Sequence, residues 1–242
     1  MDDFLKSLKN TLFIDIETIS GTQHFSELNE RMQAQWRRKA NFIDNKTLLS
    51  EEEMYFERAG IYAEFGKIIA IGIGFIHENE EKELSLKVKC FAGDDEKNVL
   101  EDFKLLLEKK FNAKKLVLCA HNGKEFDFPY ICRRMLVNQI KLPETLQLSN
   151  KKPWEIIHKD TLEMWKFGDK KHYISLELLA SLFDIQSSKQ ILSGDKVNET
   201  YYRENNLALI EEYCLEDIIV LAQLYLKFNF HETIAENNII KT

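Results

Sequence analysis

Four acidic residues that lie far apart in the sequence could together bind metal ions. Asp15 and Glu17 occur in the run LFIDIET, Asp127 in HNGKEFDF, and Asp217 in YCLED. Each acid lies inside or beside an apolar segment, where an uncompensated charge is costly to bury. Metal coordination offsets that cost. If the four carboxylates converge, the chemistry they predict is two-metal hydrolysis of a phosphodiester bond.

The first two acids are two positions apart in a predicted strand, so their side chains share one face of it. Leu12, Ile14 and Ile16 then fill the opposite face. Two neighbouring carboxylates repel each other unless a cation lies between them, and such hard oxygen ligands suit Mg²⁺ or Mn²⁺. The alternative is that Asp15 and Glu17 lie at an exposed strand end.

Tyr213 and Asp217 are four positions apart in a predicted helix, so they are neighbours on its surface. They flank the apolar stripe of that helix. The stripe consists of Leu207, Ile210, Cys214, Ile218, Leu221, Tyr225 and Phe228. The alternative is that Tyr213 packs at the edge of the core while Asp217 is exposed.

Asp127 follows the tripeptide His121-Asn122-Gly123, which ends a predicted buried strand. A strand, a glycine turn and a helix start form the place where α/β folds position ligand-contacting groups. An acid in the first turn of a helix is also ordinary dipole complementarity, so this pattern alone leaves both interpretations open.

The elements that must position these residues follow from hydrophobic periodicity. Strands are predicted at 11–17, 67–76, 84–90, 116–120 and near 160. Helices are predicted at 95–111, 126–138, 161–166, 175–183 and 204–228, with a helical insertion over about 23–60. This order predicts an α/β fold with a mixed five-stranded sheet, three strands antiparallel and two parallel, flanked by helices. We expect residues 1–242 to form a single domain.

Composition narrows the class of protein. The chain has 242 residues, of which 44% are hydrophobic, enough for a sizeable core. The net charge of −7 argues against a protein that coats nucleic acid through general electrostatics. It does not exclude an enzyme that grips a few terminal nucleotides.

Cysteine usage and the N-terminus predict a cytoplasmic protein. The four cysteines form no CxxC pair, so we expect reduced, mostly buried thiols and no zinc site. The first residues lack the basic and apolar regions of a signal peptide. No apolar run approaches the length of a membrane span, so no membrane contact is expected.

The acidic motifs together are more specific than any one of them. DxE on the first strand, N-x3-F-D after a later strand and Y-x3-D on the last long helix resemble the DEDDy subgroup of the DEDD 3′–5′ exonucleases. The segments FGKII, HNG, KKPWE, DT and WKFG resemble a bacterial group of predicted exonucleases related to the proofreading domain of B-family DNA polymerases. This resemblance runs from about residue 10 to 228. We expect no fused polymerase, because 242 residues leave no room for one.

The resemblance implies a ribonuclease H-like fold and two bound divalent cations, Mg²⁺ or Mn²⁺. It implies that Asp15 bridges both ions, that Glu17 and Asp217 complete the shell of one, and that Asp127 acts on the other. Tyr213 would orient the attacking water. The catalytic residues would thus be Asp15, Glu17, Asp127, Tyr213 and Asp217, and the product a nucleoside 5′-monophosphate.

Three further residues are substrate-binding candidates, each with a structural alternative. Thr18 could meet the terminal sugar or make strand-end hydrogen bonds. Asn122 could touch the substrate or hold the turn. Phe126 could stack on a base or pack in the core. Asp160 is left out of the metal ligands, because it could cap the following helix or support the site.

The function we expect is therefore a metal-dependent 3′–5′ exonuclease whose partner is a nucleic acid 3′ end, with single-stranded DNA favoured. One alternative is an exoribonuclease on the same scaffold, which would recognise a 2′-hydroxyl. Another is an inactive nucleic-acid-binding protein, which the complete set of acids and Tyr213 disfavours. The sequence leaves protein partners open.

Overall fold

A computed structural model describes residues 3–44, 46, 48–169, 173–186 and 191–242. Its strands are β1 (Thr11–Ser20), β2 (Gly66–Glu78), β3 (Leu84–Ala92), β4 (Val117–Ala120), β5 (Lys159–Asp160) and β6 (Ile239–Lys241). Its α-helices are α1 (Asp3–Leu8), α2 (Glu30–Ala40), α3 (Glu51–Arg58), α4 (Glu96–Lys110), α5 (Asp127–Val137), α6 (Thr161–Lys166), α7 (Leu176–Leu182), α8 (Val197–Tyr202) and α9 (Leu207–Phe228). Short 3-10 turns are η1 (Phe25–Glu27), η2 (Ala59–Ile61), η3 (Glu144–Leu146), η4 (Pro153–Glu155), η6 (Gly194–Lys196) and η7 (Glu236–Asn238).

The strands form one mixed sheet in the order β5-β4-β1-β2-β3-β6. β1, β2 and β3 are antiparallel neighbours, whereas β4 runs parallel to β1 and β5 parallel to β4. The predicted α/β class and strand directions are confirmed. The sheet has a sixth strand beyond the five predicted, because β6 pairs in parallel with β3. The three residues of β6 are too few to show the alternating pattern of a strand. The helices α1 and α8 were not predicted, because six residues show little helical periodicity.

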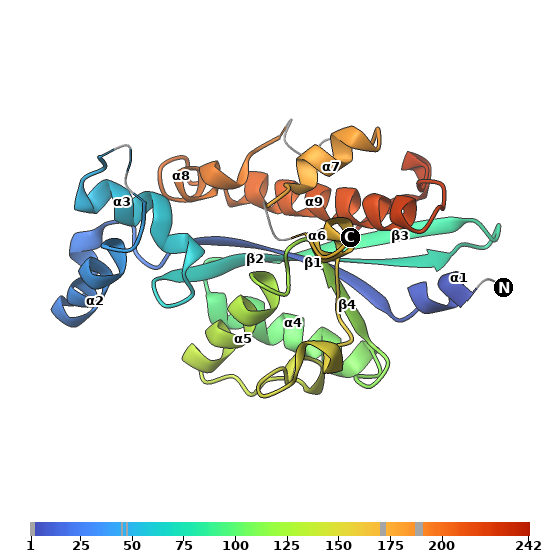
Figure 1. Cartoon of the computed structure of the whole chain (residues 1–242), viewed down its shortest axis with the longest axis horizontal. Coiled ribbons are helices and arrows are strands. Elements are labelled where there is room, and N and C mark those ends of the chain that lie inside the picture. Colours follow the sequence, from blue (N-terminus) through green and yellow to red (C-terminus); the bar gives the residue numbers. More distant parts are fainter. Residues whose placement is uncertain (1–2, 45, 47, 170–172, 187–190) are drawn as a thin grey trace.

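Helices cover both faces of the sheet. α9 extends along one face, and α4 and α5 lie against the other (Figure 1). β1 serves both layers: Leu12, Ile14 and Ile16 join the α4–α5 core, whereas Phe13 packs on Tyr225 of α9 at a ring-centroid distance of 5.5 Å. The strand alternation predicted for residues 11–17 is therefore confirmed, and it directs Asp15 and Glu17 to the α9 side.

α9 packs directly against the backbone of β2, because that strand has glycines where the helix crosses. A Cβ added at Gly72 would lie 2.8 Å from both the Cys214 Sγ and the Ile218 Cγ1. A Cβ at Gly74 would lie 2.6 Å from the Ile218 Cγ2. The missing side chains thus set the distance between helix and sheet.

The predicted helical insertion between β1 and β2 contains α2 and α3, which extend beyond one end of the sheet (Figure 1). Its own small core is aromatic. Trp36 is fully buried and meets Tyr55 and Phe65 edge-on. α3 begins with a capping box, in which Ser50 and Glu53 satisfy each other's backbone N–H groups.

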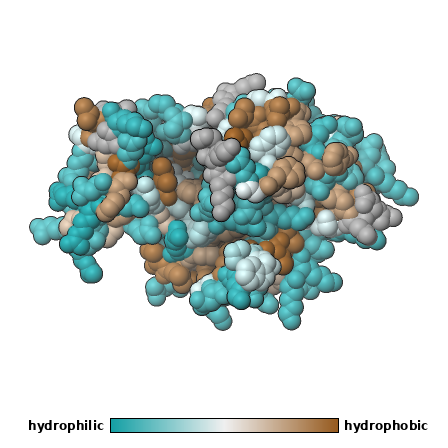
Figure 2. Space-filling view, viewed as in Figure 1, coloured by the Kyte–Doolittle hydropathy of each residue, from teal (hydrophilic) through white to brown (hydrophobic). Residues whose placement is uncertain are grey.

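Polar side chains cover most of the face shown in Figure 2, while apolar side chains gather over α7. Leu178 and Leu182 of that helix are exposed. In the described part of the chain, no helix combines the length and the apolarity that crossing a bilayer requires.

A buried ion pair fastens α5 to α4 and β2. The Glu96 carboxylate accepts two hydrogen bonds from the Arg134 guanidinium, at 2.8 and 2.6 Å. It also accepts from the backbone N–H of Ile68 and the amide of Asn138. Removing one partner of such a pair leaves the other charge buried and uncompensated.

We therefore expect Glu96→Ala to destabilise the protein by about 3–5 kcal/mol. Glu101→Ala is the matched control on the same helix, because Glu101 pairs with Lys97 at an exposed position. It should cost about 0.5 kcal/mol or less. Urea unfolding of both variants measures the difference; equal losses would show that the buried pair contributes no more than a surface pair.

Candidate active site

Asp15 and Glu17 lie on β1 and face α9. The Glu17 side chain is buried and that of Asp15 half-buried. One carboxylate oxygen from each acid and the Sγ of Cys214 lie within 4.8 Å of one another. The pairing of β1 with β2 shifts register directly after Glu17, as a β-bulge does, and such bulges re-aim side chains next to functional sites.

Asp127, the first residue of α5, lies beside the edge of β1. β4 pairs with β1 only as far as Phe13, so the following part of β1 has a free edge. The chain leaves β4, turns through Asn122 in a left-handed conformation at φ 63°, and starts α5 at Asp127. The backbone N–H of Ile16 hydrogen-bonds to the Asp127 carboxylate across that free edge.

The Asp127 carboxyl is 3% exposed, and burial raises its pKa to about 7, while the N–H groups of Asp127 and Ile16 oppose the rise. The charges of Asp160 and Asp217 contribute to this rise. Among the described residues its Oδ1 has no hydrogen-bond partner. A buried carboxylate oxygen without a partner is costly, and a cation would satisfy it.

Tyr213 and Asp217 lie one turn apart on α9 and hydrogen-bond through their side chains. Tyr213 is buried among Ile19, Ile69 and Val197. Burial raises the pKa of its hydroxyl above the usual range, and repulsion by Asp217 and Glu17 adds to the rise. The phenol therefore stays neutral and can donate a hydrogen bond.

The structure places all four predicted acids close enough to act on one another electrostatically. Burial raises the pKa of Asp15 well above its usual range, and the charges of Asp127, Glu17 and Asp217 raise it further. Burial likewise raises the pKa of Glu17, with Asp217 the next cause. Four converging carboxylates with an unsatisfied buried oxygen fit divalent cations, for which oxygen ligands are preferred.

The substrate-binding candidates lie around this cluster. Thr18 follows the bulge and hydrogen-bonds to the Tyr130 hydroxyl. Phe126 is half-buried and packs on Tyr130 at a ring-centroid distance of 5.4 Å. Asn122 occupies the tight turn described above. These contacts are the structural alternatives foreseen for the three residues, and roles in substrate binding stay predictions.

Asp160 organises the turn that leads to Asp127. Its carboxylate accepts from the backbone N–H groups of Asn122 and Lys124, at 2.9 and 3.0 Å. It also caps α6 by accepting from Leu162 and Glu163. The helix cap predicted for Asp160 is therefore confirmed, and the same carboxylate fixes the turn before Asp127. Its support of the site stays a prediction.

Sequence patterns did not identify Tyr173 as a neighbour of the acids. Partial burial of its hydroxyl raises the pKa of Tyr173, and the charges of Asp15 and Asp127 add to the rise. His121 holds this segment, because its Nε2 bonds the Ile174 carbonyl at 2.8 Å. Burial lowers the pKa of His121, so the ring is neutral there. No local spacing links Tyr173 to the acids, since the contact arises only from the fold.

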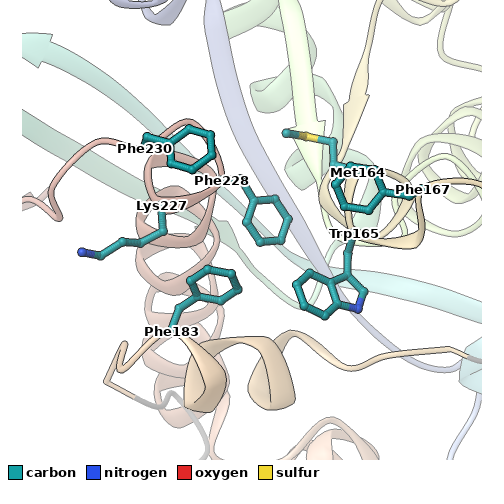
Figure 3. A pocket seen from close by; sticks show the side chains of 7 residues that line it. All are labelled: Met164, Trp165, Phe167, Phe183, Lys227, Phe228 and Phe230. Atoms are coloured by element: carbon teal, nitrogen blue, oxygen red, sulfur yellow. The ribbon is translucent and has the colours of Figure 1, made fainter.

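A separate apolar pocket of about 480 Å³ lies where α6, α7 and the end of α9 meet (Figure 3). Trp165, Phe183 and Phe228 point toward one another in it. The residues lining it are Met164, Trp165, Phe167, Phe183, Lys227, Phe228 and Phe230. Lys227 lies ten residues beyond Asp217 on α9, about 15 Å along the axis. This lining holds no carboxylate, so the pocket is not the place for hydrolysis.

Comparison with known proteins agrees with this arrangement. The family described as "Predicted 3'-5' exonuclease related to the exonuclease domain of PolB" matches residues 61–240. No curated protein matches the sequence.

A solved structure, the family B DNA polymerase from the hyperthermophilic archaeon Pyrobaculum calidifontis, resembles the chain with a TM-score of 0.53 and 14% identity. The likeness covers 90% of this chain and 24% of the polymerase, so the chain spans about a quarter of that protein. At this identity the likeness shows a shared fold. Because the family match extends over most of the sequence, the chain belongs to the predicted 3′–5′ exonucleases related to the exonuclease domain of PolB.

Proposed function

We propose that this protein is a DEDDy-type exonuclease that removes nucleotides from the 3′ end of single-stranded DNA. The observation that carries the proposal is the convergence of Asp15, Glu17, Asp127 and Asp217, with Tyr213 hydrogen-bonded to the last of them. DNA is favoured over RNA because the family is described as related to the exonuclease domain of PolB, and a solved structure with the same fold is a family B DNA polymerase.

The four carboxylates would hold two divalent cations, Mg²⁺ or Mn²⁺. Such ions supply an acidified water and stabilise the leaving oxygen. Asp15 interacts electrostatically with all three other acids and would contribute to both ions, while Asp127, next to Ile16, would complete one of them. The product would be a nucleoside 5′-monophosphate.

Tyr213 would position the attacking water without taking its proton. Its buried hydroxyl has a pKa raised above the usual range, so a phenolate is disfavoured. A neutral hydroxyl can still fix the orientation of water by hydrogen bonding.

A labelled-oligonucleotide assay tests the activity. DNA and RNA oligomers labelled at either end are incubated with Mg²⁺, Mn²⁺ or EDTA. We expect metal-dependent loss of single nucleotides from the 3′ end, with DNA preferred. Faster degradation of RNA would favour the exoribonuclease alternative, and no metal-dependent trimming of either would refute the enzyme.

Replacing the proposed metal ligands should abolish trimming. Asp15→Ala and Asp127→Ala each remove a carboxylate from the cluster, and we expect no measurable release of mononucleotides. Glu125→Ala is the matched control, because Glu125 is exposed and only two residues from Asp127. If Asp127→Ala behaves like Glu125→Ala, Asp127 is not part of the active site.

Tyr213→Phe keeps the ring and removes only the hydroxyl. We expect kcat to fall on the order of 10²-fold, while the affinity for Mn²⁺ measured by calorimetry is unchanged. Tyr201→Phe is a control, because the Tyr201 hydroxyl bonds Asp94 outside the cluster. A normal kcat for Tyr213→Phe would rule out the positioning role.

The free energy of unfolding of the metal-free protein should depend on pH, because the pKa of Asp127 is raised in the folded state. The pKa of Asp127 is raised from 3.8 to about 7, so between these values the folded chain holds a proton that the unfolded chain lacks. The contribution of Asp127 to stability is therefore complete below about pH 3.8 and is lost as pH rises toward about 7, by about 1.4 kcal/mol per unit of pKa difference.

Thermal unfolding in EDTA at a series of pH values measures this trend. Mn²⁺ binds the deprotonated carboxylates, so its stabilising effect should grow with pH. Asp127→Asn should flatten the EDTA profile, and Asp102→Asn, at an exposed position of α4, should not. A profile for Asp127→Asn as steep as that of the wild type would contradict the assignment.

A further inference from the structure

Cys214 lies directly beside the proposed metal ligands, although it belongs to the apolar stripe of α9. Asp15, Gly72 and Cys90 occupy matching positions on β1, β2 and β3 and form a row across the sheet. The Cys214 thiol fills the space above Gly72, where any Cβ would lie 2.8 Å from its Sγ. It is fully buried, and its Sγ lies 4.0 Å from the Oδ2 of Asp15.

The thiol is close enough to the carboxylates to share an ion with them. Oxygens of Asp15 and Glu17 and the Sγ of Cys214 all lie within 4.8 Å of one another. Around tetrahedral zinc, sulfur and oxygen ligands lie about 3.5 Å apart, given bond lengths of 2.3 and about 2.1 Å. Shifts of about 1 Å or less would bring the three donors to one ion.

A second observation is an unsatisfied carboxylate oxygen close to these donors. The Oδ1 of Asp127 is buried without a hydrogen bond from the described residues, and Asp127 is the charge with the largest effect on Asp15. A cation bound here would therefore reduce the repulsion among the carboxylates, and the spacing of the donors would accommodate it.

A site with both carboxylate and thiol donors can bind two classes of divalent ion. Mg²⁺ and Mn²⁺ prefer oxygen ligands and gain little from a thiol, whereas zinc and similar soft ions prefer thiolate sulfur. A zinc ion with three protein ligands is an ordinary arrangement.

We propose that Cys214 gives this site a second mode of metal binding, in which one thiophilic divalent ion such as Zn²⁺ or Cd²⁺ is held by Asp15, Glu17 and Cys214. The ion displaces the thiol proton to solvent, and Cys214 binds as thiolate. Because Asp15 and Glu17 are shared with the two-cation arrangement, the thiophilic ion excludes it and inhibits hydrolysis. The inhibition rests on the proposed exonuclease function, but the binding does not.

Cadmium titration followed by ultraviolet absorbance tests the binding. A sulfur-to-cadmium charge-transfer band reports a thiolate ligand directly, without any nuclease assay. We expect a band that saturates at one Cd²⁺ per chain and is abolished by excess Mn²⁺, which competes for the carboxylates. Cys214→Ser should lose the band and bind Cd²⁺ at least about tenfold more weakly.

Two cysteine variants are matched controls. Cys90→Ser changes the neighbouring thiol, and Cys119→Ser changes a buried thiol in another part of the core; both should keep the band. Circular dichroism establishes that each variant is folded. If Cys214→Ser fails to fold, Asp15→Asn with Glu17→Gln serves instead, because loss of the carboxylates should remove the band while all four cysteines remain.

A full band in Cys214→Ser, or one that survives loss of both carboxylates, would overturn the proposal. The result of the cadmium titration is independent of the result of the exonuclease assay. Cadmium bound through Cys214 in a protein without nuclease activity would support this site and refute the enzyme. Active protein that shows no charge-transfer band would do the reverse.

Discussion

Repulsion among buried carboxylates is the interaction on which the rest of this structure depends. Burial and mutual repulsion both raise the pKa of Asp15, so without a cation the cluster favours protonation. The surrounding fold must therefore hold the acids together against a force that would separate them. It does so with elements that are rigid for other reasons: a central strand, a long helix on one face of the sheet and a turn fixed by hydrogen bonds.

Each acid is held by a different kind of support. Asp15 and Glu17 are held by the pairing of β1 with β2. Asp217 is held by α9, whose apolar stripe is anchored in the sheet through residues such as Ile218 and Leu221. Asp127 depends on Asp160, a fifth carboxylate that accepts hydrogen bonds from the preceding turn and from the start of α6. The negative charge of Asp160 is thus stabilised by backbone N–H groups.

The sequence allowed prediction of relations between residues that are close along the chain. The period of a strand places Asp15 and Glu17 on one face, and the period of a helix makes Tyr213 a neighbour of Asp217. The order of motifs, through a family resemblance, linked these pairs to Asp127. Contacts that depend on how elements pack had no such signal. The bond from Ile16 to Asp127, the place of Tyr173 and the position of Cys214 over Gly72 each join segments from different parts of the fold.

The glycines of β2 have a consequence for the chemistry across the sheet. Gly72 and Gly74 let α9 settle close to β2, and Asp217 is carried on that helix while Asp15 stands on the adjacent strand. The distance between the two carboxylates therefore depends on how closely α9 packs on the sheet, and this is determined at Gly72 and Gly74. A methyl group at Gly72 or Gly74 would collide with α9, so it would move the helix outward and carry Asp217 away from Asp15.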